Sequence, residues 1–151
     1  MSKIKPNRHS VTLGGESYEL HFNLNVMEVL QEAGFDILKS QNDTPDAPDT
    51  EAEEITGWEA LTAFYHQFDK GSFKATKIML TAMINEGIDI RNESLPAGEK
   101  KPHISEWQVG NLIQGGSAAM EIRSAIHKAV DDATPKKEEG IVAKNTQATA
   151  V

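Results

Sequence analysis

The sequence predicts an α+β, mainly α fold, in which an N-terminal β-hairpin packs on a bundle of four to five helices. Three observations predict this fold. The first apolar residues alternate with polar ones on both sides of a Gly-Gly pair, which is the period of strands. Most later apolar residues recur instead at the three- and four-residue spacing of amphipathic helices. The chain of 151 residues also has the size of one ordinary domain.

Polar segments divide the chain. Hydrophobic residues make up 38% of it, which is low for a chain that is globular throughout. We therefore expect a single domain over residues 10–133, a flexible N-terminus over 1–9 and a disordered tail over 134–151. Residues 40–54 are predicted to form a mobile acidic loop, because they hold six acidic residues, two prolines and no base.

Charge and composition argue against several classes of partner. The formal net charge is -8, and such a surface repels both phosphate backbones and anionic lipid. We therefore expect neither nucleic acid nor membrane as a partner. The chain has no cysteine, which fits a reducing cytoplasm. Residues 1–10 are polar and basic with no apolar run behind them, so no signal peptide is predicted.

The hairpin is predicted from residues 10–23. Val11 and Leu13 alternate with polar residues before the turn, and Gly14-Gly15 supplies the positive φ angles that a tight hairpin turn requires. A second alternating set follows the turn and consists of Tyr18, Leu20 and Phe22. A lone hairpin is only marginally stable, so its apolar face is expected to cover a helix.

A first helix is expected over residues 24–33. Asn23 or Asn25 caps its start, and Gly34 suits a C-terminal stop. Its inward face is expected to hold Met27 and Leu30, with Leu24 or Ala33.

A second helix begins at a T-x-x-E capping box formed by Thr56 and Glu59. Its apolar stripe consists of Trp58, Leu61, Phe64, Tyr65 and Phe68. A stripe at this spacing is usually core, which is the favoured interpretation. The alternative is a partner-binding face, because Trp and Tyr are common anchors at interfaces.

A third helix is expected over residues 73–86, with Gly87 as its stop. Its inward residues are Ile78, Met79, Ala82 and Met83, and Leu80 and Ile84 widen the apolar surface. This breadth predicts that the helix is central. Residues 92–102 are expected to form a loop.

Two more helices close the domain. Ser105 and Gln108 form a second capping box, and the helix that they start is expected to end near Gly115-Gly116. It carries Trp107, Val109, Leu112 and Ile113. The last helix spans residues 117–133, and its stripe consists of Ala118, Ile122, Ala125, Ile126 and Ala129, with Val130 beside it.

No catalytic, cofactor-binding or metal-ligating set is predicted, and the chain is not expected to be an enzyme. No histidine pair has a metal-ligand spacing, and we interpret the histidines as surface or strand-face residues: His9, His21, His66, His103 and His127. The acidic loop lacks the D-x-D-x-D-G pattern of a calcium loop. Gly115-Gly116-Ser117 precedes a helix but lacks the lysine of a phosphate-binding loop, so a helix stop followed by a new start is favoured.

A DNA-binding helix-turn-helix is the rival hypothesis for residues 105–130, which read as two helices joined by a glycine-containing turn. Its second helix offers Arg123, His127 and Lys128 against Glu121, Asp131 and Asp132. That balance is nearly neutral on an acidic chain, so protein binding is the stronger prediction.

Two stretches resemble the tail assembly chaperones of long-tailed bacteriophages. Residues 11–22, V-T-L-G-G-E-S-Y-E-L-H-F, lead into V-M-E-V-L-Q-E-A-G at 26–34. They resemble the family's opening, T-L-G-G-x-x-Y-x-L-x-F, and its short helix ending in E-x-x-G or E-A-G. Residues 104–130 are similar to the family's closing helix pair, with S-E-W-Q-V-G-N-L-I resembling its S/T-x-E-x-V-x-x-L-I helix start. The acidic loop and the aromatic helix after it depart from the family's pattern and look like an insertion.

The resemblance implies a role in virion morphogenesis. Such chaperones coat the long helical tape-measure protein, help recruit tail-tube protein, and are absent from the mature virion. The implied location is therefore the host cell cytoplasm. Self-association and a frameshift-extended form, continuing beyond the tail that follows Pro135, are further expectations from the family.

Overall fold

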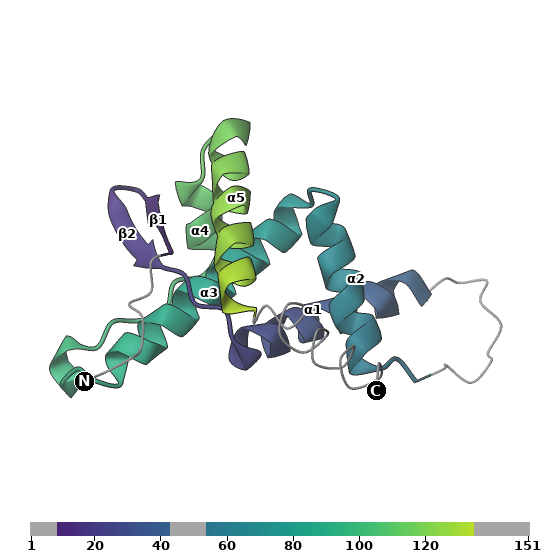
Figure 1. Ribbon diagram of the computed structural model, residues 1–151, viewed down its shortest axis with the longest axis horizontal. Helices are drawn as coiled ribbons and strands as arrows, with labels where there is room; N and C mark the ends of the chain where they lie inside the picture. The colour runs from purple at the N-terminus through teal and green to yellow at the C-terminus, as the bar shows by residue number, and fades with distance from the viewer. Residues whose placement is uncertain (1–8, 43–53, 135–151) are drawn as a thin grey trace, which may run out of the picture.

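The computed structural model describes residues 9–42 and 54–134, and it confirms the predicted mainly helical class with an N-terminal hairpin (Figure 1). The elements are β1 (Ser10–Leu13), β2 (Glu16–Glu19), α1 (Leu24–Asn42), α2 (Gly57–Asp69), α3 (Phe73–Asn92), the 3-10 turn η1 (Ala97–Glu99), α4 (Glu106–Leu112) and α5 (Gly116–Ala133). The expectations for residues 1–8, for 43–53 in the acidic loop and for the tail at 135–151 lie outside the described residues.

The predicted hairpin forms, but its second strand ends at Glu19, before the alternating residues Leu20 and Phe22. β1 and β2 pair antiparallel, with Leu13 opposite Glu16. Gly14 and Gly15 have φ angles of 57° and 85°, the pair of positive values that a two-residue hairpin turn requires. The Leu20 N–H donates to the His9 carbonyl at 2.9 Å and extends the ladder beyond the two strands. The buried side chains of the hairpin region are Val11, Leu13 and Leu20, which join the core.

Helix α3 is central, as the breadth of its apolar surface predicts. It contacts β2 and each of the other four α-helices in the described residues, and it runs through the middle of the molecule (Figure 1). The largest fully buried side chains come from α3 and from the helices around it. They include Leu30, Phe64, Met79, Leu80, Met83 and Ile126.

Two predicted helix stops are wrong. Helix α1 continues through Gly34 to Asn42, so residues 40–42 are helical and do not belong to a loop. Helix α3 likewise continues through Gly87 to Asn92. Both glycines are buried because another backbone lies against them. A Cβ on Gly34 would lie 1.7 Å from the Ala60 carbonyl oxygen, and one on Gly87 would lie 2.9 Å from that of Glu19. A glycine at each position lets another backbone approach closely. Sequence alone does not distinguish such a glycine from one that ends a helix.

The apolar stripes are correct in the middle of the helices and wrong at their starts. Leu61, Phe64 and Phe68 of α2 are buried, but Trp58 is exposed. In α1 the buried apolar side chains are Val26 and Leu30, Met27 is half-buried against the core, and Leu24 is exposed. Leu24 and Trp58 stand in the first turn of their helices, where the apolar stripe extends beyond the elements that cover it.

Side chains cap the helix starts largely as predicted. Asn23, not Asn25, caps α1 by accepting the Val26 N–H at 3.2 Å. The Ser105–Gln108 box at the start of α4 is complete. The Thr56–Glu59 box is half formed, because the Thr56 hydroxyl accepts the Glu59 N–H at 3.1 Å and also donates to the Glu59 carboxylate at 3.2 Å.

Candidate functional site

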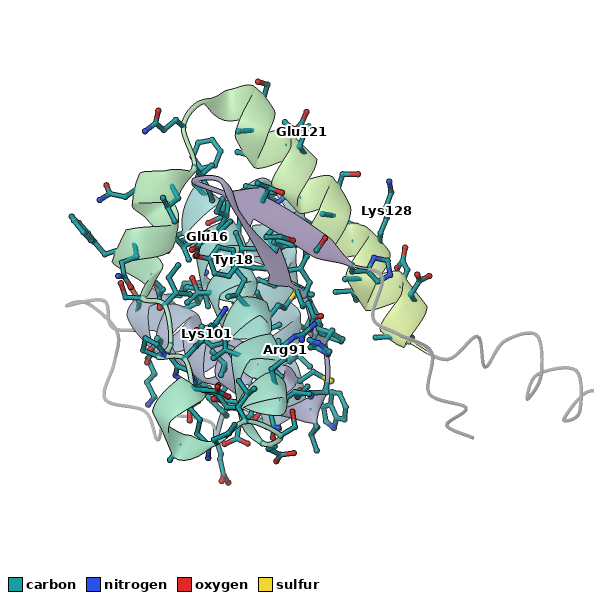
Figure 2. The ribbon with its side chains drawn as sticks, turned by 90° about the vertical axis from the view of Figure 1, so that its left-hand side faces the viewer. Glu16, Tyr18, Arg91, Lys101, Glu121 and Lys128 are labelled. Carbon is teal, nitrogen blue, oxygen red and sulfur yellow. The ribbon has the colours of Figure 1, made fainter. Side chains whose placement is uncertain are left out.

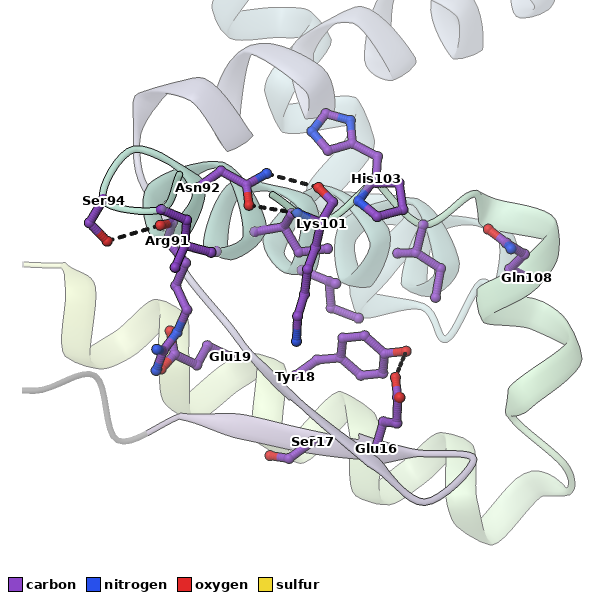
Figure 3. A pocket seen from close by; sticks show the side chains of 16 residues that line it. Glu16, Ser17, Tyr18, Glu19, Arg91, Asn92, Ser94, Lys101, His103 and Gln108 are labelled. Atoms are coloured by element: carbon purple, nitrogen blue, oxygen red, sulfur yellow. Dashed lines mark hydrogen bonds and ion pairs between the residues drawn. The ribbon is translucent and has the colours of Figure 1, made fainter. Parts of the chain in front are cut away.

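A cleft of about 920 Å³ lies between strand β2, the C-terminal half of α3 and the connection from α3 to α4 (Figures 2 and 3). Its volume is within the range of ~300–1,000 Å³ that is typical of ligand pockets. Its apolar lining residues include Ile84, Ile88, Leu95 and Ile104. Its polar lining residues include Glu16, Tyr18, Glu19, Arg91, Lys101 and Gln108. An apolar floor with a few polar groups at the rim suits a ligand that has both characters.

The outer edge of β2 forms one wall of the cleft. Hydrogen-bonded and non-hydrogen-bonded residue pairs alternate along an antiparallel ladder. His9 and Leu20 form a hydrogen-bonded pair, so Thr12 and Ser17, three pairs further along, form a non-hydrogen-bonded pair. The N–H and C=O of Ser17 therefore point away from β1. Further along, the same edge meets α3, where the His21 N–H donates to the Met83 carbonyl at 3.3 Å. The edge of β2 and helix α3 are therefore in contact at His21, and they diverge toward Ser17.

Two asparagines of α3 fix the opposite wall. The Asn92 amide donates to the Lys101 carbonyl at 2.8 Å and accepts the Lys101 N–H at 2.9 Å. Asn85, two helical turns earlier, binds the backbone of Ile104 in the same way, at 2.9 and 2.8 Å. These four bonds hold residues 101–104 along α3. Neither asparagine was predicted as a site residue from the sequence, although their seven-residue spacing places them on one helix face.

Lys101 extends its side chain into the cleft (Figure 3). The other basic side chains of the lining have partners: Arg91 donates to the Glu19 carboxylate, and His103 Nε2 lies 2.7 Å from Asp89 Oδ1. Within residues 9–42 and 54–134, the Lys101 ammonium has no carboxylate partner. The cleft therefore presents one ammonium without a carboxylate partner, Lys101, and one carboxylate without a cationic partner among the described residues, Glu16.

Tyr18 lies across the cleft from Lys101. Its hydroxyl donates to the Glu16 carboxylate at 3.0 Å. Partial burial raises the pKa of the Tyr18 hydroxyl, and the hydrogen bond and negative charge of Glu16 raise it further. Tyr18 is therefore protonated at neutral pH and orients the Glu16 carboxylate at the hairpin end of the cleft.

The Glu19–Arg91 ion pair should make the stability of the protein depend on pH in the acid range. The hydrogen bond from Arg91 lowers the pKa of the Glu19 carboxyl below its usual 4.5, against a smaller opposing effect of burial. A lowered folded-state pKa stabilises the fold above the unfolded-state pKa, and that contribution is lost as the pH falls through the folded-state value. We expect Glu19→Gln to flatten the decline of the melting temperature below about pH 5. Glu93→Gln is the control and should melt like the wild type at each pH; equal slopes in all three proteins would contradict the assignment.

The basic residues of the helix-turn-helix hypothesis do not share one surface. Arg123 points inward and donates to the Phe68 carbonyl at 2.6 Å and to Thr76 Oγ1 at 3.1 Å. The His127 ring packs 5.2 Å from the Phe68 ring, centroid to centroid. Lys128 is exposed beside a small hollow that Glu121 also lines (Figure 2).

The other predicted positions are placed as follows. His9 and His21 lie beside the carboxylates of Asp132 and Glu19, at 2.6 and 3.3 Å. Gly115, with a φ of 98°, directly precedes α5, as predicted for a new helix start, but α4 already ends at Leu112, so the predicted helix stop near Gly115-Gly116 is wrong. Across the part of the chain that is described, no group of three or more His, Cys, Asp or Glu is arranged to hold a metal ion. None of the described helices has the length and apolar character needed to cross a bilayer.

Large apolar side chains remain uncovered on each of the five α-helices. The most exposed are Leu24 (76%), Trp58 (74%), Trp107 (73%), Phe73 (72%) and Met120 (66%). Single exposed apolar residues are normal, but two tryptophans and a phenylalanine exposed to this degree are the residue types that anchor protein interfaces.

The chain matches no protein-family model, no curated protein and no solved structure. Its function is therefore inferred from the cleft, from the exposed apolar side chains and from the sequence pattern.

Proposed function

We propose that this protein is a tail assembly chaperone of a long-tailed bacteriophage, a non-enzymatic module that binds the tape-measure protein and helps recruit tail-tube subunits. The observation that carries the proposal is the exposure of Leu24, Trp58, Phe73, Trp107 and Met120 on five different helices. The resemblance of residues 11–34 and 104–130 to that family supports it.

The physical chemistry of the proposed role is simple. A long helical protein with bare apolar stripes aggregates unless another surface covers those stripes. Exposed aromatic and aliphatic side chains supply the covering contacts. The net charge of -8 keeps the resulting complex soluble through mutual repulsion. The proposal places the protein in the host cell cytoplasm and not in the mature virion.

The DNA-binding alternative has less support. A recognition helix must present basic or amide side chains to phosphates and bases. In α5 the Arg123 guanidinium is instead bound to the end of α2, and exposed Lys128 lies near Glu121.

Co-expression with the tape-measure protein tests the proposal. We expect the tape-measure protein to be soluble and to co-purify with this chain, and to be insoluble alone. The double variant Trp58→Ala, Trp107→Ala should recover several-fold less of it, because truncating a tryptophan anchor costs about 2 kcal/mol or more of binding. Both residues are exposed, so the fold should be unaffected.

The matched control is Thr62→Ala, Asn111→Ala, which truncates exposed polar residues on the same two helices, α2 and α4. This variant should recover as much tape-measure protein as the wild type. Equal aggregation of the tape-measure protein with and without this chain would overturn the proposal.

A further inference from the structure

We propose that the cleft beside β2 binds an extended acidic segment of a partner polypeptide, which pairs with the outer edge of the strand at Ser17 and places a carboxylate on Lys101. This goes beyond the chaperone function, because it adds a second binding mode for extended chain to the covering of helical stripes. It rests on the backbone of β2 and on the charges of the cleft, not on the exposed tryptophans.

The outer edge of β2 offers main-chain groups to a partner strand at Ser17. The N–H and C=O of Ser17 point away from β1 toward the cleft, and no intramolecular partner for them is found within the described residues. An extended peptide satisfies such a pair with its own C=O and N–H, which is strand addition at a sheet edge. The Glu19 carbonyl lies against Gly87 of α3, which leaves no room for a partner strand at that position. The added strand is therefore short and centred on Ser17.

The side chains of the cleft suit a peptide that carries both apolar and acidic residues. Successive residues of an extended peptide point in opposite directions. A side chain of the partner that points into the cleft meets the floor formed by Ile84, Ile88 and Ile104, and a carboxylate at a nearby position of the partner reaches Lys101, which lines the same cleft. Since Arg91 is engaged by Glu19, and His103 by Asp89, the Lys101 ammonium is the cation available to a carboxylate. The one opposing charge, Glu16, is held at the hairpin end by Tyr18.

A labelled peptide of alternating valine and glutamate is the probe, with binding to the full chain measured by fluorescence anisotropy at low salt. We expect this peptide to bind, and the same peptide with lysine in place of glutamate to bind at least tenfold more weakly. A third peptide, with proline at the central valine, should also bind at least tenfold more weakly, because proline removes a main-chain donor.

Paired variants of the protein identify the two contacts. Lys101→Ala should weaken binding of the glutamate peptide about tenfold, whereas Lys100→Ala, its neighbour outside the cleft lining, should not. Ser17→Pro removes the N–H that faces the cleft and leaves the β1–β2 ladder intact, because proline is tolerated where a strand N–H faces outward. Thr12→Pro makes the same change on the opposite edge and should bind normally. Glu16→Gln should bind more tightly.

Several results would overturn the inference. Equal binding of the glutamate and lysine peptides would remove the role of Lys101, and so would a normal affinity of Lys101→Ala. Equal losses for Ser17→Pro and Thr12→Pro would remove the strand pairing. If Ser17→Pro does not fold, as circular dichroism would show, the proline peptide alone decides that point.

Absence of peptide binding, with self-association that Lys101→Ala abolishes, would assign the cleft to a second copy of the chain. The assay contains no tape-measure protein, so its failure is distinguishable from failure of the chaperone proposal.

Discussion

Gly34→Ala is expected to destabilise the protein strongly, although alanine is the better helix former. Alanine in a helix interior gains up to about 1 kcal/mol over glycine. Here its Cβ would lie 1.7 Å from the Ala60 carbonyl oxygen and 2.4 Å from the carbonyl carbon. Those are backbone atoms of α2, which cannot rotate aside, so α1 and α2 must separate. Overpacking typically costs about 1–3 kcal/mol and occasionally more, and a clash with backbone atoms lies at the upper end of that range. We expect a net loss of at least ~2 kcal/mol for Gly34→Ala and unfolding for Gly34→Val.

Urea unfolding followed by circular dichroism measures this effect. The control is Gly116→Ala, the same substitution in the first turn of α5, where nothing lies within 4 Å of the added Cβ. It should leave the urea midpoint unchanged or slightly raised. If Gly34→Ala behaves like Gly116→Ala, the close crossing of α1 and α2 at this residue is wrong.

The same glycine shows where sequence reasoning succeeds and where it stops. Alternation around Gly14-Gly15 predicted the hairpin, and helical spacing with capping residues predicted α2 and α5 nearly to their ends, because these are local patterns. The start of α4 was also predicted, but this helix ends at Leu112, before the predicted end near Gly115-Gly116. Gly34 and Gly87 were taken for helix stops because their role depends on backbones that are distant in sequence, those of Ala60 and Glu19. No local pattern distinguishes a glycine that ends a helix from one that admits a neighbour.

The candidate site was less predictable for the same reason. The cleft forms where the β2 edge diverges from α3 and where Asn85 and Asn92 hold the chain at residues 101–104. Each of these contacts joins segments whose relative placement is set by the whole fold. Residue types alone therefore gave no reason to single out Ser17 or Lys101.

Arg123→Ala is expected to produce the second large effect, and that effect discriminates between the two functional hypotheses. The guanidinium donates to the Phe68 carbonyl at 2.6 Å and to Thr76 Oγ1 at 3.1 Å, and its carbon lies 4.3 Å from the Phe68 ring centroid. It thus joins α5 to the end of α2 and the start of α3. A hydrogen bond from a charged group contributes about 1.5–3 kcal/mol, and a cation–π contact about 0.5–2 kcal/mol. We expect a loss of ~2–3 kcal/mol and a melting temperature lower by roughly 10 °C.

The pattern across three variants tests this assignment. Arg123→Lys keeps the charge but not the planar fork, so its melting temperature should fall between those of the wild type and Arg123→Ala. Lys128→Ala, at an exposed position of the same helix, should melt like the wild type. A DNA-binding α5 predicts the opposite result, in which Arg123→Ala and Lys128→Ala both weaken salt-sensitive duplex binding and neither lowers the melting temperature. Because Arg123 cannot both bind the Phe68 carbonyl and reach the DNA, a large loss of stability in Arg123→Ala removes one of the two cations, Arg123 and Lys128, that the DNA hypothesis assigns to α5.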